Sequence, residues 1–257
     1  MVQPMSNAPT ILLLPGLLCD ASVWKVQRPA LETLAPVVVA DLSRQSSLVE
    51  MAQSALESVS GPLIVIGHSM GARVAMEIWR LAPARVVKLA LLGTGVHPVQ
   101  PGEAERRQKL VDLAYREGMA ALAEVWLPPL VDARRVGEES LMAPLREMVM
   151  RATADQHARQ IKALIDRPDA AALAATISCP TLVMVGRQDR WSPPAQHEEI
   201  VSLVRNAKLR VVEDSGHMLT VEQPEATTRA LVESISRSVQ RRKNLFFEKK
   251  KQKTFVN

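Results

Sequence analysis

The sequence has few aromatic residues, few cysteines and no long hydrophobic run. Phe, Trp and Tyr together make up 3% of its 257 residues. A transmembrane helix needs roughly 18 or more consecutive apolar residues, and no such stretch occurs. The segment Met1–Pro9 lacks the basic start and apolar centre of a signal peptide. We therefore expect a soluble, cytoplasmic protein with no membrane partner.

Cofactor motifs are missing as well. The two cysteines, Cys19 and Cys179, lie beside expected strands and show no metal-ligand spacing. Free cysteines in such places usually act as small buried hydrophobes rather than as halves of a disulfide. No phosphate-binding loop, dinucleotide fingerprint or zinc motif occurs. The sequence therefore predicts no cofactor and no metal site.

The excess of positive charge is confined to one end of the chain. The formal net charge is +5, and residues 241–257 hold seven basic residues and one acidic residue, which leaves −1 for the remainder. The same segment holds all three phenylalanines. We interpret 241–257 as a disordered basic tail and expect no nucleic-acid partner. Contact of this tail with a membrane or a nucleic acid is the less favoured alternative.

Short apolar, β-branched runs alternate with helical patterns in both halves of the chain. This alternation predicts an α/β fold with a doubly wound, mainly parallel sheet of about six strands. An apolar content of 47% is enough for a full core, and the length suits one such domain with an insertion. The expected strands are Thr10–Leu14, Val37–Ala40, Leu63–Gly67, Lys88–Gly93, Thr181–Gly186 and Leu209–Glu213.

The pattern changes after His97. From 98 to 170 there are no β-rich runs, only helical stretches separated by prolines. We expect helices at Ala104–Arg116, Met119–Trp126, Leu141–Arg151 and Ala154–Ile165. The sequence thus predicts a core formed by 1–97 and 171–240, with a helical cap inserted at 98–170.

The pentapeptide Gly67-His68-Ser69-Met70-Gly71 lies between the strand Leu63–Gly67 and the expected helix Ala72–Leu81. A turn this tight brings the two glycine positions against each other, where a side chain would clash. It also points the Ser69 hydroxyl outward and places a helix N-terminus beside it. A G-x-S-x-G pattern occurs by chance in loops, but the flanking strand and helix favour Ser69 as a nucleophile.

A serine nucleophile needs a base, and five histidines compete for that role. His217 is the best placed, because the loop Asp214–His217 follows directly after an expected strand. His68 neighbours Ser69 but points away from it, as a packing residue would. His157 and His197 fall in helices, where we expect solvated positions. His97 lies at the start of the helical insertion, where it would line a pocket or serve as a hinge residue.

The base needs a carboxylate to fix its tautomer. Asp189 follows the strand Thr181–Gly186, so it lies at a carboxyl end of the sheet like Ser69. Asp41 and Asp214 are weaker alternatives, more typical of a loop cap and a turn former. The sequence therefore predicts a triad of Ser69, Asp189 and His217.

On these residues the chain resembles the α/β-hydrolase superfamily from Ile11 to about Val239, particularly its small capped esterases and enol-lactonase-like members. The resemblance rests on Leu14-Pro15-Gly16-Leu17, Gly67-His68-Ser69-Met70-Gly71, Cys179-Pro180-Thr181 through Asp189, and Ser215-Gly216-His217 with Glu222-Gln223-Pro224. The chain order Ser, Asp, His is the order of that fold. The resemblance implies Ser69 as nucleophile, His217 as base and Asp189 as its orienting acid. It also implies an oxyanion hole made by the backbone N–H groups of Leu17 and Met70.

A pocket between Ser69 and the cap would hold the substrate. We expect its apolar lining to come from Leu18, Trp126, Leu127, Leu130, Met142, Leu145, Trp191, Met218 and Leu219, although leucine and methionine at helical spacing also pack against the domain below. Such a pocket favours a small-molecule partner, a small to medium ester or lactone. Carbon–carbon bond hydrolysis, thioester hydrolysis and perhydrolysis use the same triad and stay open. A non-catalytic ligand receptor is disfavoured, because all three triad members are present. No motif fixes a cluster of arginines or lysines, so the sequence predicts no preference for dicarboxylates.

Overall fold

The computed structural model describes residues 8–236 and contains a parallel sheet of six strands in the order β2-β1-β3-β4-β5-β6. Every neighbouring pair of strands is parallel. The strands are β1 (Thr10–Leu14), β2 (Val37–Val39), β3 (Leu63–His68), β4 (Val86–Leu92), β5 (Thr181–Gly186) and β6 (Ala207–Val212). The expected fold class is therefore confirmed.

The ends of β2, β3, β4 and β6 differ from the expected ones by one residue, and two strands begin earlier than expected. β4 begins at Val86 rather than Lys88, and β6 begins at Ala207 rather than Leu209. In both strands a lysine interrupts the apolar pattern near the true start. The Lys88 ammonium is buried and donates to the carbonyls of Ser234 and Ile235, so a charged side chain is accommodated inside the domain. Lys208 lies on the edge strand β6, where it is exposed.

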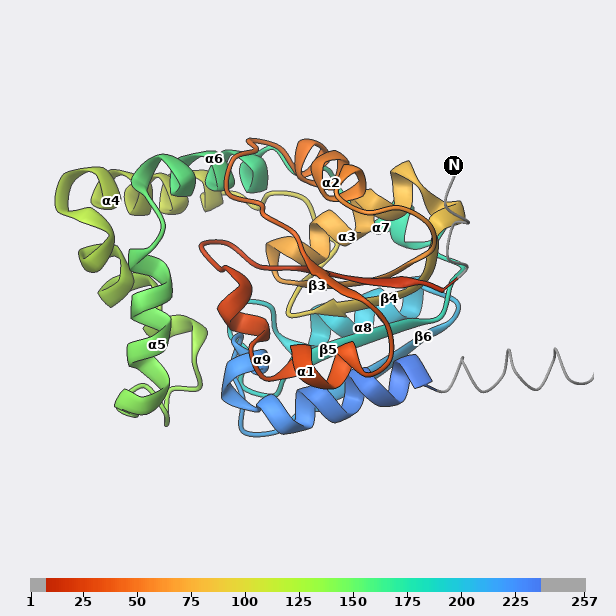
Figure 1. Cartoon of the computed structure of the whole chain (residues 1–257). Helices are drawn as coiled ribbons and strands as arrows, with labels where there is room; N and C mark the ends of the chain where they lie inside the picture. The colour runs from red at the N-terminus through yellow and green to blue at the C-terminus, as the bar shows by residue number, and fades with distance from the viewer. Residues whose placement is uncertain (1–7, 237–257) are drawn as a thin grey trace, which may run out of the picture.

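Helices cover both faces of the sheet, as Figure 1 shows. On one face lie α2 (Leu48–Glu57), α3 (Met70–Leu81) and α7 (Ala171–Ala174). α8 (Pro194–Leu203) packs beside α7 on this same face. On the other face lie α1 (Gln27–Glu32) and the helix at 224–236. Short turns complete the connections: η1 (Ala21–Trp24), η2 (Pro83–Arg85) and α9 (Leu219–Glu222). No helix within 8–236 is long and apolar enough to span a bilayer.

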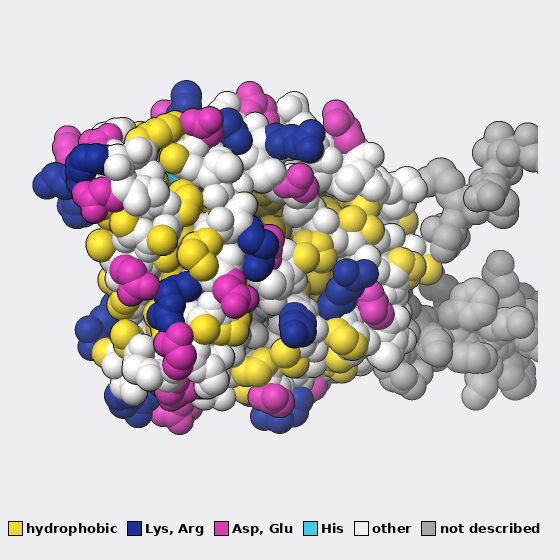
Figure 2. All heavy atoms as spheres, turned by 60° about the vertical axis from the view of Figure 1, so that its left-hand side comes forward, with side chains coloured by type: hydrophobic (Ala, Val, Ile, Leu, Met, Phe, Trp, Pro, Cys, Tyr) yellow, Lys and Arg dark blue, Asp and Glu magenta, His cyan; other side chains and the backbone are white. Residues whose placement is uncertain are grey.

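The connection between β4 and β5 contains helices and no strand. Before α7 it comprises α4 (Glu103–Trp126), η3 (Pro128–Leu130), α5 (Glu139–Met150) and α6 (Ala154–Ile165). α4 is interrupted at Gly118, which has φ 86°, so it corresponds to the two helices expected there. These elements lie at the end of the sheet where the strands finish (Figure 1). Acidic, basic and hydrophobic side chains alternate on the face that they contribute to (Figure 2).

The division into a core and a cap stays a prediction, as does the disordered tail, which lies outside the described residues.

Two histidines that were expected to be solvated are fully buried instead. His157 lies on the inner face of α6, and neither of its ring nitrogens has a hydrogen-bond partner among the described residues. His197 lies on the inner face of α8. Its Nε2 accepts from the Thr94 N–H, and its Nδ1 donates to the Pro193 carbonyl. Burial lowers the pKa of each to about 4. The expectation was wrong because both helices use the histidine face for packing.

Acid should destabilise the protein through these buried histidines. The folded-state pKa of His157 is about 4, below its ordinary value of 6.5, so the unfolded chain binds a proton between these pH values that the folded protein does not. The stabilising contribution is therefore complete above pH 6.5 and is lost as the pH falls toward 4. We expect it to be about 3 kcal/mol in total for His157. Urea unfolding at pH 7.5, 5.5 and 4.5 measures it.

His157→Leu is the matching variant, because it removes the titrating ring and two buried polar atoms without a partner. We expect the free energy of unfolding of this variant to fall less steeply with decreasing pH than that of the unmodified protein. The difference in slope should reach up to about 1.4 kcal/mol per pH unit between pH 6.5 and 4. An unchanged pH dependence in this variant would contradict the assignment.

Candidate active site

Ser69 lies between β3 and α3 in a strained conformation, with φ 56° and ψ −118°. Its N–H donates to the Leu92 carbonyl at 2.8 Å. A Cβ at Gly67 would lie 2.3 Å from the Gly71 carbonyl oxygen, and one at Gly71 would lie 2.1 Å from the Leu14 carbonyl oxygen. Neither position can hold a side chain, so the expectation that the turn needs both glycines is confirmed.

The structure brings Ser69, His217 and Asp189 together. His217 Nε2 lies 2.8 Å from Ser69 Oγ, and His217 Nδ1 lies 2.8 Å from Asp189 Oδ2. The other carboxylate oxygen of Asp189 accepts from the N–H groups of Trp191 and Ser192. Burial alone would raise the pKa of Asp189, but His217 and these bonds outweigh it, and the pKa is lowered. Asp189 is therefore ionised at neutral pH and fixes the orientation of the His217 ring.

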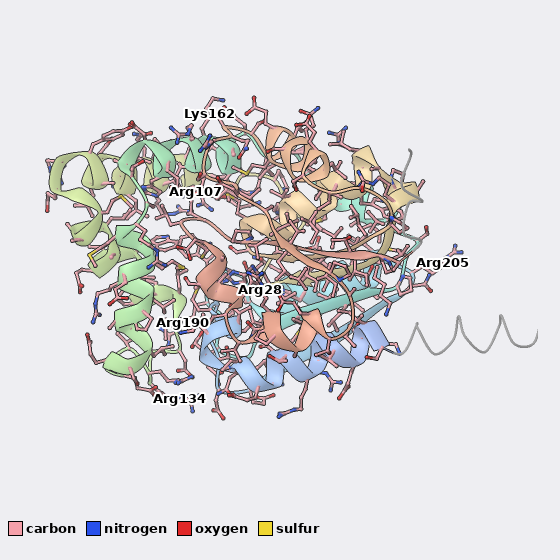
Figure 3. All side chains as sticks on the ribbon, in the orientation of Figure 1. Arg28, Arg107, Arg134, Lys162, Arg190 and Arg205 are labelled. Atoms are coloured by element: carbon pink, nitrogen blue, oxygen red, sulfur yellow. The ribbon has the colours of Figure 1, made fainter. Side chains whose placement is uncertain are left out.

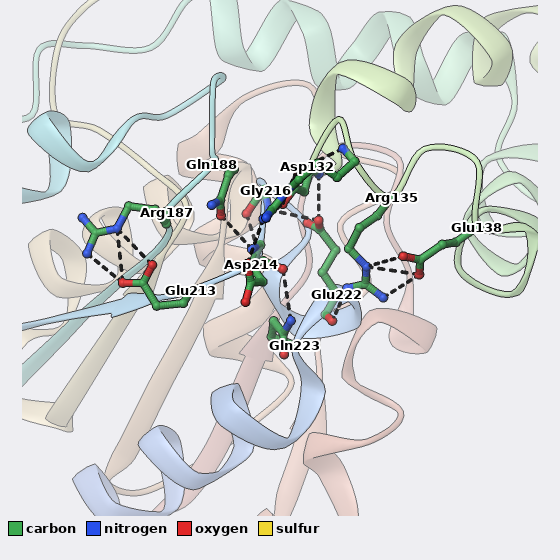
Figure 4. A network of polar contacts seen from close by, with 12 residues as sticks. Asp132, Arg135, Glu138, Arg187, Gln188, Glu213, Asp214, Gly216, Glu222 and Gln223 are labelled. Atoms are coloured by element: carbon green, nitrogen blue, oxygen red, sulfur yellow. Dashed lines mark hydrogen bonds and ion pairs between the residues drawn. The ribbon is translucent and has the colours of Figure 1, made fainter.

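Glu222, on the short helix α9, holds the loop that carries His217 (Figure 4). Its carboxylate accepts from the N–H groups of Gly216, Met218 and Asp132, at 2.9, 3.1 and 2.8 Å. Two of these flank His217, and Asp132 belongs to the helical insertion. The Leu130 carbonyl accepts from the His217 N–H at 2.8 Å. The backbone around His217 is thus fixed from both sides.

His68 packs beside His217, as a packing residue would. Its Nε2 lies 2.9 Å from the His217 carbonyl, and the two ring centroids are 5.1 Å apart. Burial, with a smaller effect of His217, lowers the pKa of His68 to about 3. His68 is therefore neutral at physiological pH, and its Nε2–H donates to that carbonyl.

Two backbone N–H groups were expected to form an oxyanion hole. Neither the Leu17 N–H nor the Met70 N–H donates a hydrogen bond to any residue within 8–236. Both residues line the cavity beside Ser69, and Met70 is the first residue of α3. Unpaired N–H groups at a helix N-terminus attract negative charge.

A cavity of about 630 Å³ opens above Ser69, between the sheet and the helices inserted after β4. This size suits a small to medium ligand. Of the expected lining residues, the cavity is lined by His97, Trp126, Leu130, Trp191 and Met218. Those that do not line it are Leu18, Leu127, Met142, Leu145 and Leu219. Leu18 lies instead on a separate hollow, and its N–H donates to the Gln160 side chain of α6 at 2.9 Å.

The cavity also holds arginines that the sequence analysis did not single out. Arg73, Arg107 and Arg167 are buried and line it together with Glu103. Arg73 lies one helical turn after Ser69, so its spacing was a usable signal. Arg107 and Arg167 come from α4 and from the segment after α6, and only the tertiary fold brings them near Ser69.

Asp41 and Asp214 lie away from the triad. The Asp41 carboxylate accepts from the Ser43 N–H, and Asp214, with φ 53°, pairs with Arg134. Within the described part of the chain, no group of three or more His, Cys, Asp or Glu side chains is arranged to hold a metal ion.

Residues 11–230 match the model of the Alpha/beta hydrolase family, and the chain belongs to this family. Among solved structures, a thermophilic esterase from Thermogutta terrifontis in a malate-bound form is similar, with 27% identity, a TM-score of 0.81 and 90% of each chain covered. The enol-lactonase from Burkholderia xenovorans LB400 has a similar fold, with 23% identity and a TM-score of 0.81, covering 91% of this chain and 94% of its own.

Curated relatives include 2-hydroxy-6-oxononadienedioate/2-hydroxy-6-oxononatrienedioate hydrolases. The protein from Cupriavidus pinatubonensis is 28% identical over 66% of this chain and 60% of its own length. That from Paraburkholderia xenovorans is 27% identical over 86% of this chain and 75% of its own length. The chain spans about 60% of the length of the relatives from C. pinatubonensis and Pseudomonas putida.

Glu222→Gln tests the support of the His217 loop. An amide has one accepting oxygen and cannot satisfy three N–H donors, so at least one buried donor loses its partner. We expect the free energy of unfolding to fall by about 1–3 kcal/mol and the amide hydrogens of Gly216 and Met218 to exchange faster. Glu225→Gln, at a neighbouring exposed site, is the control. Equal behaviour of the two variants would show that the carboxylate does not support the loop.

Proposed function

We propose that this α/β hydrolase is a serine hydrolase that cleaves a small to medium carboxylic ester or lactone. The observation that carries the proposal is the continuous series of hydrogen bonds from Asp189 through His217 to Ser69, with both links at 2.8 Å. A serine hydroxyl becomes a good nucleophile at neutral pH when a positioned imidazole takes its proton.

In the proposed reaction, Ser69 Oγ attacks the carbonyl carbon while His217 Nε2 takes the hydroxyl proton. The resulting tetrahedral oxyanion accepts from the N–H groups of Leu17 and Met70. His217 then protonates the leaving alkoxide, and an acyl group stays on Ser69. Water, deprotonated by His217, attacks this acyl-enzyme and releases the carboxylic acid and the free serine. Asp189 stabilises the imidazolium in both halves of the reaction.

The helices of 98–170 act as a cap in this proposal. They supply Trp126 and Leu130 to the cavity lining, and the core supplies Trp191 and Met218. These apolar side chains suit the hydrocarbon part of an ester or lactone and keep bulk water from the acyl-enzyme.

Carbon–carbon bond hydrolysis is the second candidate, because the curated relatives from C. pinatubonensis and P. xenovorans are named as hydrolases of 2-hydroxy-6-oxononadienedioate and its triene analogue. Neither compound name contains an ester or a lactone. The likeness to the T. terrifontis esterase, which covers more of both chains, favours the ester. A substrate panel of esters, lactones, thioesters and vinylogous 1,5-diketones separates these reactions, and it includes peracid formation.

Ser69→Ala should abolish turnover of p-nitrophenyl butyrate. Loss of the nucleophile lowers kcat/KM by about three orders of magnitude or more, because no other group takes over the covalent step. Labelling by a fluorophosphonate probe should disappear in the same variant. The Asp189→Asn variant should still be labelled at Ser69, but far more slowly.

Ser202→Ala is the matched control, since this exposed serine lies on α8 away from the cavity. It should label and turn over like the unmodified protein. Undiminished hydrolysis by Ser69→Ala would refute the proposed function.

A further inference from the structure

The cavity beside Ser69 has a strong excess of basic side chains. Its lining includes six basic residues, Arg73, Arg106, Arg107, Lys109, Arg167 and Arg190, and one acidic residue, Glu103. The chain without residues 241–257 has a formal net charge of −1. The positive charge is therefore concentrated at the cavity and does not reflect a basic protein.

Arg73 is buried beside the nucleophile and forms no ion pair with an acidic side chain of residues 8–236, although Glu103, Asp169 and Glu199 are near enough to raise its pKa. Its two terminal nitrogens donate to the backbone carbonyls of Val96 and His97, at 3.0 and 2.7 Å. Carbonyl oxygens satisfy the N–H groups but do not neutralise the charge. Burial, together with the nearby Arg167, lowers the pKa of Arg73 to about 9, so it stays charged at neutral pH. A buried charge of this kind is stabilised by an opposite charge brought in by a ligand.

Glu103 is shared between two of the other arginines. It pairs with Arg107 at 2.8 Å and with both terminal nitrogens of Arg167, at 2.7 and 2.8 Å. The buried set of Arg73, Arg107, Arg167 and Glu103 therefore keeps a net charge of +2. The guanidinium of Arg107 also lies over the Trp191 ring, 5.6 Å from its centre, and both residues line the cavity.

Arg190 adds a charge at the rim of the cavity. It follows Asp189 directly, is exposed, and makes no ion pair with any residue of the described part. Figure 3 places Arg107 and Arg190 at the end of the sheet that the helical insertion covers, whereas Arg205 lies at the opposite end.

We propose that the substrate of the Ser69 site carries a carboxylate away from the bond that is cleaved, and that Arg73, Arg107 and Arg190 attract and hold this group. This inference rests on the proposed function and specifies its substrate class as an anionic ester or lactone. Apolar lining residues contact the hydrocarbon part, and the guanidinium groups offer charge-assisted hydrogen bonds to the carboxylate.

The buried arginines also hold the backbone at 96–98, since Arg167 donates to the Pro98 carbonyl and Arg73 to the two residues before it. If these arginines only stabilised the backbone, the same hydrogen bonds would form, but the protein would show no preference for an anionic substrate. The preference itself is therefore the decisive readout.

Matched ester pairs measure that preference. Mono-4-nitrophenyl glutarate and methyl 4-nitrophenyl glutarate differ only in a free carboxylate on the acyl side. The pair 4-acetoxybenzoate and methyl 4-acetoxybenzoate makes the same comparison on the alcohol side. We expect kcat/KM to be at least about tenfold higher for the anionic member of one pair. We expect this ratio to fall as NaCl is raised from 0.05 to 0.5 M.

Variants then test the named arginines. Arg190→Gln should reduce the anionic-to-neutral ratio several-fold, and Arg73→Gln should reduce it further. Melting temperatures identify any loss of folding in Arg73→Gln, and Arg190→Gln, at an exposed site without ion pairs, keeps the test valid if that occurs. Arg205→Gln removes the same charge far from the cavity and should leave both rates unchanged.

Equal rates within both pairs, or a ratio that Arg190→Gln and Arg73→Gln leave unaltered, would overturn the carboxylate inference while Ser69-dependent hydrolysis stands. If Ser69→Ala still hydrolyses all four esters, the proposed function fails instead. In that case calorimetric titration of Ser69→Ala with sodium glutarate decides the inference: binding that Arg190→Gln weakens supports it, and no binding overturns it.

Discussion

Backbone segments meet at the carboxyl end of the sheet with no room for side chains between them. A Cβ at Gly71 would lie 2.1 Å from the Leu14 carbonyl oxygen, and a Cβ at Gly186 would lie 2.1 Å from the Gly216 carbonyl oxygen. The ends of β1, β3 and β5 are therefore joined to the Ser69 turn and to the His217 loop through main-chain contacts. The relative positions of the reacting groups are set by backbone, which is stiffer than any arrangement of long side chains.

The helical insertion also makes close backbone contacts with the His217 loop. A Cβ at Gly216 would lie 2.7 Å from the Asp132 nitrogen, and the carboxylate of Glu222 accepts from both of these backbone N–H groups. Leu130 lines the cavity and also accepts from the His217 N–H. A change in the cavity wall at Leu130 would thus move the histidine backbone, so ligand fit and triad geometry are coupled through one loop.

The parts of the site that follow from local patterns could be predicted from the sequence. Ser69 and Asp189 each follow a short apolar strand, and parallel strands end at the same edge of a sheet, so their proximity follows from strand order alone. The spacing of Gly67 and Gly71 indicates the turn. The helix Ala154–Ile165 has the expected bounds, since its periodic apolar positions define it.

The remainder depends on contacts between distant segments. Nothing local distinguishes His157 and His197 from solvated helical histidines, because the burial of each is decided by which helix face meets another element. The same holds for Arg107 and Arg167, which share Glu103 only after α4 and the segment behind α6 are brought together. Leu18 was expected to line the cavity, but it lies on a separate hollow, with φ 56° and its N–H bonded to Gln160, 142 positions away.

Burial lowers the pKa of both kinds of basic group around the triad, but with different consequences for their charge. It keeps His68 and His197 neutral, with pKa values of about 3 and 4, because imidazole loses its proton at little cost. The ordinary pKa of an arginine is much higher, so Arg73, with its pKa lowered to about 9, keeps its charge at neutral pH. Over the physiological pH range the buried Arg73 guanidinium in the cavity therefore keeps its positive charge. This guanidinium charge stays nearly constant with pH, so negative charge that enters or develops beside Ser69 meets a favourable field that pH changes in this range do not remove.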